Sequence, residues 1–256
     1  MKSILARILG RMGYTIAKNS TIAALNSAAT RSRDLDFLTA MPDAHLAELL
    51  KLLPLSHSQL RQDLFVLSEL GLKRGGYFVE FGAASGKELS NTWLLEKHFG
   101  WSGILAEPAK CWHERLAANR TCAIEHRCVW KFTGNSLEFA EASEAEISTL
   151  SSFKDGDQHA SSRRSSHHYQ VETISLIDLM AEHKAPDNPE YLSIDTEGSE
   201  LEILQAFDFK RYPFKVITCE HNFTPAREKI HSLLTAAGYA RKHVKISDFD
   251  DWYVRA

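Results

Sequence analysis

Residues 77–86 read Tyr-Phe-Val-Glu-Phe-Gly-Ala-Ala-Ser-Gly, and residues 104–108 read Ile-Leu-Ala-Glu-Pro. The first apolar run ends in a turn of small residues, and the second ends in Glu107. Small residues let the backbone approach a ligand, and a carboxylate at the next strand end can accept hydrogen bonds from two ribose hydroxyls. The two stretches therefore predict an α/β fold with a site for a nucleoside-containing cofactor.

The composition is that of an ordinary globular protein, with 44% hydrophobic and 25% charged residues in a chain of 256. The formal net charge is only −3, so we do not expect nucleic acid as a partner. No apolar run has the length of a membrane span. The four cysteines form no C-x-x-C pair, which argues against a zinc knuckle and is typical of reduced thiols in the cytoplasm.

From residue 75 onward, strand-like and helix-like segments alternate. This alternation predicts a Rossmann-like, doubly wound, mostly parallel seven-stranded sheet with right-handed crossovers. Only a short turn-like stretch separates the last two strands, so we expect the sheet to end in an antiparallel hairpin. The seven expected strands cover residues 77–81, 103–106, 122–126, 191–194, 216–219, 241–245 and 252–255.

The first 57 residues are predicted to form a helical, partly flexible N-terminal extension. Ser, Thr, Asn and Ala dominate residues 19–32, which predicts a loosely ordered connector. Leucines at helical spacing predict helices over residues 42–53 and 58–70. Residues 58–256 are expected to form the main domain.

Residues 1–18 leave two interpretations open. In a helix, one face would be apolar and would consist of Ile4, Leu5, Ile8 and Met12. Two arginines, Arg7 and Arg11, would lie away from this face. Such a helix could rest on an anionic membrane, or it could pack on its own domain or on a partner. Because Arg7 interrupts the apolar stretch, a signal peptide fits poorly. We therefore expect a cytoplasmic protein, peripheral to the inner face of a membrane in the first interpretation.

An insertion around residues 131–173 interrupts the main domain. It contains two strand-like stretches at 137–139 and 171–174. Its centre, residues 155–168, is rich in Ser, His, Asp and Arg. This composition predicts a mobile polar loop, with a lid over the acceptor as the alternative.

The first turn lacks the three-glycine pattern with which dinucleotide folds approach a pyrophosphate, since no glycine lies between Gly82 and Gly86. Glu80 would also repel a pyrophosphate, whereas it suits a cationic amino group. S-adenosylmethionine has an ammonium, a ribose diol and no phosphate, so it fits better than NAD. The expected contacts to the ammonium, the backbone turn and the ribose are Glu80, Gly82, Ala83, Gly86 and Glu107.

Four stretches resemble, in order, the FkbM family of S-adenosylmethionine-dependent methyltransferases. They are residues 58–67, 76–83 (Gly-Tyr-Phe-Val-Glu-Phe-Gly-Ala), 100–108 and 191–204, the last similar to the family's "KIDVEGAE" motif but with Ser193 where Lys is frequent. The resemblance covers residues 58–255. It implies a class I methyltransferase domain, S-adenosylmethionine as donor, and O-methylation of a hydroxyl on a sugar, glycan or other small-molecule acceptor.

Two alternatives stay open at this point. A scaffold module of the same fold could bind the donor without turnover, because fold does not guarantee activity. An NAD-binding oxidoreductase is a weaker alternative. The sequence leaves the oligomeric state open.

Two strand ends carry the candidates for proton transfer. An acceptor hydroxyl must lose its proton, for which a carboxylate, an imidazole or a metal could serve. Asp195 and Glu197 follow one strand, Glu220 and His221 end the next, and parallel strand ends meet at the same sheet edge. We expect catalytic roles for Asp195, Glu197 and His221, and substrate contacts for Asn91, Glu220 and His221.

Two further assignments complete the predicted site. By position after the third strand, Cys128 and Val129 are expected to flank the adenine, and Asp195 is expected to contact the cofactor as well. The carboxylates would suit Mg²⁺ better than zinc, so Mg²⁺ stays open, although no metal ligands are assigned.

Overall fold

The computed structural model describes residues 17–256, so the predicted membrane-contacting segment lies almost wholly outside the described residues. The chain divides into two compact units, Met1–Ala40 and Met41–Ala256. In the first unit, α2 (Asn19–Ala40) is a continuous helix of 22 residues. The expected connector at 19–32 is therefore wrong, because this alanine-containing stretch lacks proline and glycine and favours helix. Among the described helices, none has the length and apolar character that a bilayer crossing requires.

The second unit begins with short helical segments. They are η1 (Asp43–His45), α3 (Leu46–Leu52), η2 (Leu53–Leu55) and α4 (Gln62–Glu69). The leucine spacing predicted this region as helical, and Leu49 and Leu64 are fully buried. These segments belong to the larger unit rather than to an N-terminal extension ending at residue 57.

A mixed seven-stranded sheet forms the centre of the second unit, in the order β10-β11-β9-β8-β1-β2-β3. Strands β3, β2, β1, β8 and β9 pair in parallel, whereas β11 is antiparallel to both β9 and β10. The α/β class is confirmed. The strand bounds are β1 (Tyr77–Phe81), β2 (Ser102–Ala106), β3 (Ala123–Glu125), β8 (Tyr191–Ile194), β9 (Val216–Glu220), β10 (Tyr239–Lys242) and β11 (Asp250–Arg255).

The sixth strand differs from its expected range of 241–245. Strand β10 ends at Lys242 because His243 adopts a positive φ of 53°, a conformation that leaves the extended region. The strand order also places β11 inside the sheet, between β9 and β10.

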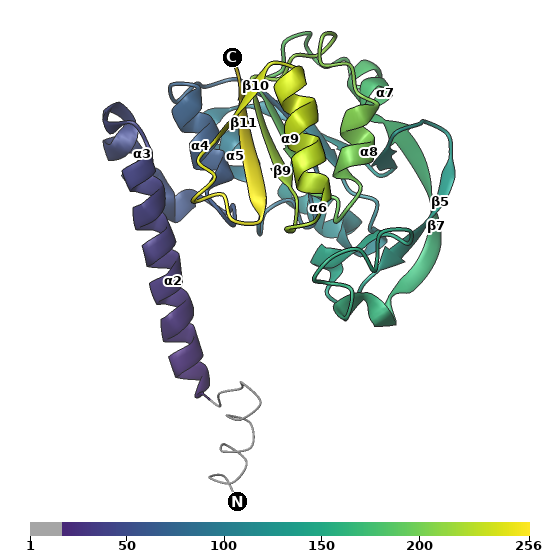
Figure 1. The fold of residues 1–256 in the computed structure, drawn as a ribbon, viewed down its shortest axis with the longest axis horizontal. Helices are drawn as coiled ribbons and strands as arrows, with labels where there is room; N and C mark the ends of the chain where they lie inside the picture. Colours follow the sequence, from purple (N-terminus) through teal and green to yellow (C-terminus); the bar gives the residue numbers. More distant parts are fainter. Residues whose placement is uncertain (1–16) are drawn as a thin grey trace, which may run out of the picture. The chain divides into compact units, whose positions relative to one another are not determined.

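Helices cover both faces of this sheet (Figure 1). On one face the apolar core joins alternate strand residues, such as Val79 and Ile217, to helices α7 (Leu176–Glu182), α8 (Glu200–Gln205) and α9 (Ala226–Ala236). On the other face, Phe65 of α4 stacks on Trp252 of β11 with ring centroids 4.7 Å apart. The remaining helices are α5 (Trp93–Phe99), η3 (Lys110–Trp112) and α6 (His113–Asn119).

The insertion forms a second, four-stranded sheet in the order β4-β7-β5-β6. Strands β5 and β7 form its long ribbon beside the main sheet (Figure 1). Both strand-like stretches that the sequence indicated lie in this ribbon. The bounds are β4 (Cys128–Trp130), β5 (Ser136–Glu141), η4 (Ala145–Ile147), β6 (Thr149–Leu150), η5 (Ser162–Ser165) and β7 (His167–Ser175).

Candidate functional site

Two adjoining cavities lie at the carboxyl ends of the parallel strands, where α/β folds bind ligands. With the open solvent at its mouth included, the first cavity has a volume of about 570 Å³, and the second has about 830 Å³. The two cavities share a wall made of Phe81, Gly82, Ala84, Glu146, Asp195 and Glu197.

The first cavity is mainly apolar. Four of the predicted cofactor-binding residues line this cavity: Gly82, Glu107, Cys128 and Val129. The sequence reasoning missed the contribution of η3 and of the insertion, which add Trp112, Phe139, Ala145, Ser148 and Leu150. The indole Nε1 of Trp112 is buried and has no hydrogen-bond partner within residues 17–256, so it is free to donate to a ligand.

Glu107 is a buried carboxyl group of the first cavity and is 5% exposed. Its Oε2 accepts a hydrogen bond from the backbone N–H of Ala84 at 2.8 Å, and its Oε1 accepts one from Ala109 at 2.7 Å. Burial raises its pKa to about 7 despite these two hydrogen bonds. Each carboxylate oxygen has a second lone pair available, so Glu107 can still accept the two hydroxyls of a diol.

The two glycines of the first turn are required by packing inside the protein. A Cβ on Gly82 (φ +70°) would lie 1.9 Å from the backbone oxygen of Asp195. A Cβ on Gly86 (φ +74°) would lie 2.5 Å from Leu116 Cδ1. Ala83 is 2% exposed and lines the second cavity rather than the first. The small residues thus let strand ends and α6 approach each other at the cavity floor.

Glu80 lines the second cavity, but its carboxylate is engaged by the loop that follows β1. It accepts hydrogen bonds from the backbone N–H of Asn91 at 2.7 Å, from Ser90 Oγ at 3.0 Å and from Thr92 Oγ1. The buried Arg120 guanidinium lies 3.7 Å away. These contacts give Glu80 a role in holding the loop, which is different from the direct ammonium contact that the sequence suggested.

The second cavity is lined mainly by polar side chains. Asn91 and Glu220, both predicted to contact substrate, line it. Asn91 donates to Ser193 Oγ at 3.0 Å, while its Oδ1 is buried without a partner in the described part of the chain. The sequence reasoning missed several of its residues, because their local patterns carry no signal: Gln59, Gln158, His159 and Asn222.

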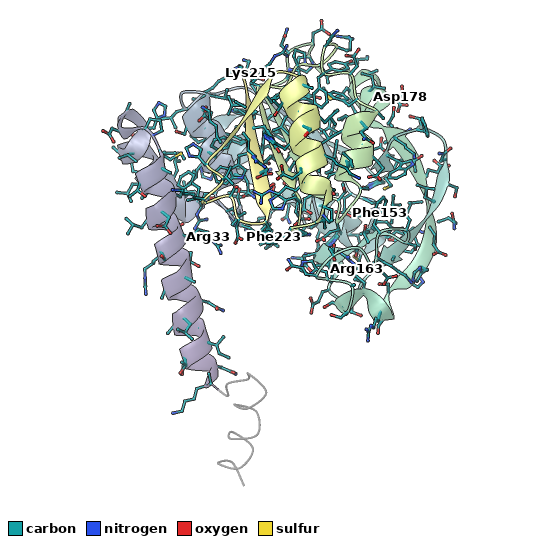
Figure 2. The ribbon with its side chains drawn as sticks, viewed as in Figure 1. Arg33, Phe153, Arg163, Asp178, Lys215 and Phe223 are labelled. Carbon is teal, nitrogen blue, oxygen red and sulfur yellow. The ribbon has the colours of Figure 1, made fainter. Side chains whose placement is uncertain are left out.

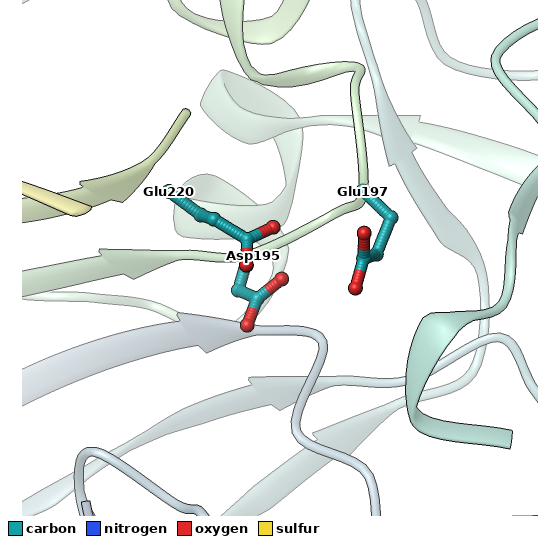
Figure 3. Close-up of side chains that lie close together, drawn as sticks. All are labelled: Asp195, Glu197 and Glu220. Atoms are coloured by element: carbon teal, nitrogen blue, oxygen red, sulfur yellow. The ribbon is translucent and has the colours of Figure 1, made fainter. Parts of the chain in front are cut away.

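Three carboxyl groups gather where the two cavities meet (Figure 3). One oxygen from each of Asp195, Glu197 and Glu220 lies within 4.8 Å of the others. Burial raises the pKa of Asp195 to about 6, against a hydrogen bond with Glu220. Burial and the charge of Asp195 raise the pKa of Glu197 to about 9 and that of Glu220 well above its usual value. Burial and mutual repulsion therefore shift the pKa of all three carboxyl groups towards the protonated form.

Arg163, from the predicted mobile loop, is bound to this cluster. It is 1% exposed, and its Nη2 donates to Glu197 Oε2 at 2.7 Å. The expectation that residues 155–168 are a mobile polar loop is wrong at this position, because a buried guanidinium must be paired inside the protein. Two histidines of the same stretch, His167 and His168, lie exposed on β7 and line neither cavity.

The carboxyl cluster does not support a magnesium site. Glu197 is already paired with Arg163 and with Asn222 Nδ2 at 3.1 Å. The carboxyl oxygens of Asp195 and Glu220 lie within 4.8 Å of each other, and each group raises or lowers the pKa of the other. Magnesium requires a near-octahedral set of free oxygen ligands, and here a guanidinium already provides the positive charge.

His221 lies apart from the two cavities, contrary to its predicted catalytic and substrate roles. Its Nδ1 accepts a hydrogen bond from the backbone N–H of Phe223, and its Nε2 lies 3.8 Å from Asp251 Oδ1. Neighbouring strand residues point to opposite faces, so Glu220 faces the cavities and His221 faces away. The next residue, Asn222, lines the second cavity instead.

Several solved structures are similar to this chain. A methyltransferase FkbM from Methylobacillus flagellatus KT is 13% identical, with 90% of this chain and 60% of that chain covered and a TM-score of 0.47. A precorrin-6y C5,15-methyltransferase from Geobacter metallireducens GS-15 is 15% identical, with coverages of 70% and 71% and a TM-score of 0.38. A SAM-dependent methyltransferase from Aquifex aeolicus is 13% identical, with coverages of 81% and 96% and a TM-score of 0.36.

The chain spans 60% of the length of the Methylobacillus protein. No curated protein matches the sequence. Residues 80–252, however, match the family described as the methyltransferase FkbM domain. This range includes both glycines of the first turn, Glu107, the insertion and the whole carboxyl cluster. The chain belongs to the FkbM methyltransferase family.

Proposed function

We propose that this protein uses S-adenosylmethionine to methylate a hydroxyl group, and that the acceptor is a sugar or glycan. The observation that carries the proposal is the pair of adjoining cavities with one shared wall. The first cavity is mainly apolar and contains Glu107 besides the shared Asp195 and Glu197, and the second is lined mainly by polar side chains. Membership of a methyltransferase family supports the reaction class, and the polar second cavity supports a hydroxyl-rich acceptor.

The residues of the first cavity fit S-adenosylmethionine. Glu107 would hold the ribose hydroxyls, while Cys128 and Val129 would flank the adenine. Trp112 Nε1 offers a buried donor that lacks a partner among the described side chains. When bound, S-adenosylmethionine supplies a methyl group activated by its sulfonium. The family fold and this donor set are the support for the cofactor.

The second cavity offers groups that can orient and deprotonate a hydroxyl. Asn91 Oδ1 and Glu220 Oε2 are buried without partners in the described chain and can accept hydrogen bonds from the acceptor. Three carboxyl groups line both cavities: Glu146, Asp195 and Glu197. Glu146 is exposed and Glu197 is bound to Arg163, so we assign proton acceptance from the hydroxyl to Asp195. The proton is then shared between the carboxyl groups of Asp195 and Glu220.

Calorimetry and turnover test this proposal. The protein should bind S-adenosylmethionine and S-adenosylhomocysteine but not NAD. With a panel of neutral sugars and glycans, formation of S-adenosylhomocysteine should depend on Asp195. Positioned bases contribute about 10²- to 10⁴-fold, so Asp195→Asn should lower turnover by about this factor and change donor affinity far less. Donor binding without turnover on any acceptor would favour the scaffold alternative, and binding of NAD alone would refute the cofactor assignment.

A further inference from the structure

Arg163 uses all of its hydrogen-bonding capacity inside the protein. A guanidinium has five N–H donors. Nε donates to the backbone oxygen of Ile147 at 2.6 Å, and Nη2 donates to Glu197 at 2.7 Å. Asp157 accepts two further bonds at 2.8 and 3.0 Å, and the backbone oxygen of Lys154 accepts a weaker one at 3.4 Å. Arg163 is therefore committed to holding protein groups and not to binding a ligand.

The turn after β8, residues 196–198, is held by the insertion at two more points. Thr149 Oγ1 donates to the backbone oxygen of Glu197 at 3.0 Å. Phe153 packs against Gly198, where an added Cβ would lie only 3.1 Å from Phe153 Cβ. Glu197 itself has a φ of +58°, a left-handed conformation that costs free energy in a non-glycine residue. Contacts from the insertion thus surround a strained turn.

The residues next to the groups that Arg163 binds also line the second cavity. Glu146 and Ile147 line the second cavity next to the Ile147 oxygen that Arg163 binds. Gln158 and His159 line it next to Asp157. Figure 2 shows Arg163 and Phe153 among the side chains of the insertion. Holding these residues in place therefore also shapes the wall of the second cavity.

We propose that Arg163 is a positioning residue that clamps the insertion onto Glu197 and so fixes the wall shared by the two cavities. The insertion is then a fixed wall that determines which acceptor fits, and not a loop that opens and closes. This goes beyond the proposed function in assigning acceptor recognition to Glu146, Ile147, Gln158 and His159. The assignment of acceptor recognition and the donor-affinity readout rest on the proposed function, whereas the clamp itself does not.

The first test is limited proteolysis of the full-length protein. Arg163→Met should increase chymotryptic cleavage at or near Phe153 by at least about tenfold, because the clamp no longer closes the segment. Arg164→Met is the matched control, since Arg164 is exposed and lines neither cavity. Arg163→Lys should recover part of the protection, because its ammonium can pair with one of the two carboxylates.

The second test separates positioning through Glu197 from general structural support. We expect Arg163→Met to weaken S-adenosylhomocysteine affinity at least fivefold, because Glu197 lines the first cavity. In a Glu197→Gln background the same change should alter the affinity less than twofold, since the partner that Arg163 positions is already changed. Glu197→Gln alone provides the reference for this comparison.

Two results would overturn the proposal. One is cleavage of Arg163→Met no faster than that of Arg164→Met. The other is an equal loss of affinity in both backgrounds, which would make Arg163 a structural residue only. If the unmodified protein did not bind S-adenosylhomocysteine, the proposed function would fail, while the proteolysis test would still decide whether the clamp exists.

Discussion

At Gly82 the requirement for glycine comes from the neighbouring strand end and not from the ligand alone. The sequence suggested that small residues at 82–86 let a cofactor approach the backbone. The structure shows that the position of a Gly82 Cβ is already occupied by the backbone oxygen of Asp195. The first turn and the end of β8 are therefore packed directly together, which places Asp195 beside the turn.

This contact predicts a large loss of stability for Gly82→Ala. The left-handed φ costs about 1–2 kcal/mol for a residue with a Cβ, and the overlap with Asp195 adds about 1–3 kcal/mol of strain. Gly75→Ala is the matched control, because Gly75 has a similar φ of +68° but no heavy atom within 4 Å of an added Cβ. Urea unfolding should show Gly82→Ala less stable than Gly75→Ala; equal losses would contradict the packing argument.

Glu107 predicts a pH dependence of donor affinity. Burial raises its pKa to about 7 in the ligand-free protein, and only the ionised carboxylate keeps all its lone pairs for the ribose hydroxyls. Since the acid form dominates below pH 7, affinity should fall as pH decreases, by about tenfold between pH 8 and pH 6. Calorimetry with S-adenosylhomocysteine measures this change.

Glu107→Gln separates this effect from that of Asp195, whose pKa is about 6. The variant should bind more weakly at pH 8 and lose most of the pH dependence. Glu114→Gln, on the exposed side of α6, should behave like the unmodified protein. A pH dependence that survives unchanged in Glu107→Gln would assign the titration to another group.

At the scale of elements, Arg120 joins β1, α5 and the loop between them. It follows α6, is 3% exposed, and donates to Glu96 Oε2 at 2.6 Å, to Gly86 O at 3.0 Å and to Thr92 Oγ1 at 2.9 Å. Its charge also lies beside Glu80. One guanidinium therefore holds the loop that forms the floor of the second cavity.

Removing this guanidinium should destabilise the fold strongly. Arg120→Met leaves buried carboxylates without their cation, which typically costs about 3–5 kcal/mol. Arg115→Met in α6, the helix that Arg120 follows, is the control, because the Arg115–Glu88 pair is exposed and such pairs contribute about 0–1 kcal/mol. Chemical denaturation at pH 7 compares the two variants.

The pH dependence of the Arg120 effect has a defined sign. Burial acts to raise the pKa of Glu96, but Arg120 and several hydrogen bonds outweigh it and lower the pKa to about 2. The stability from this pair is thus present above pH 4.5 and lost as pH falls towards 2. The difference between Arg120→Met and the unmodified protein should shrink over that range, and a constant difference would contradict the electrostatic explanation.

At the scale of the whole molecule, the sequence predicted the parts of the fold that repeat a local pattern. The apolar strands ending near Glu80, Glu107 and Asp195 could be read because their side chains are buried in continuous runs. The burial of Arg163 could not be predicted, because the polar stretch around it has the composition of a solvent-exposed loop. Only the tertiary pairing with Glu197 buries this residue.

The candidate site likewise contains residues that a local sequence pattern predicted and residues that only tertiary contacts bring in. Asp195, Glu197 and Glu220 were predicted together because parallel strand ends meet at one edge, and the structure brings them within 4.8 Å. The roles predicted for His221 gain no support, because it follows the end of β9, lines neither cavity and lies against Phe223 and Asp251 instead. Gln158 and His159 were missed because the insertion reaches the cavities through its own sheet, and a pairing between distant segments leaves no local signal.

Residues 1–18 provide the last prediction. Their apolar face and arginines leave two interpretations open, contact with an anionic membrane and packing on the domain or on a partner, and the membrane interpretation makes a testable prediction. Deleting them should abolish co-sedimentation with phosphatidylserine vesicles, and replacing Arg7 and Arg11 by glutamine should weaken it several-fold through lost electrostatic attraction. S-adenosylhomocysteine affinity should not change, because among the described residues the lining of the two cavities begins at Gln59. Equal sedimentation with phosphatidylcholine vesicles, or none in the unmodified protein, would instead assign these residues to protein contacts.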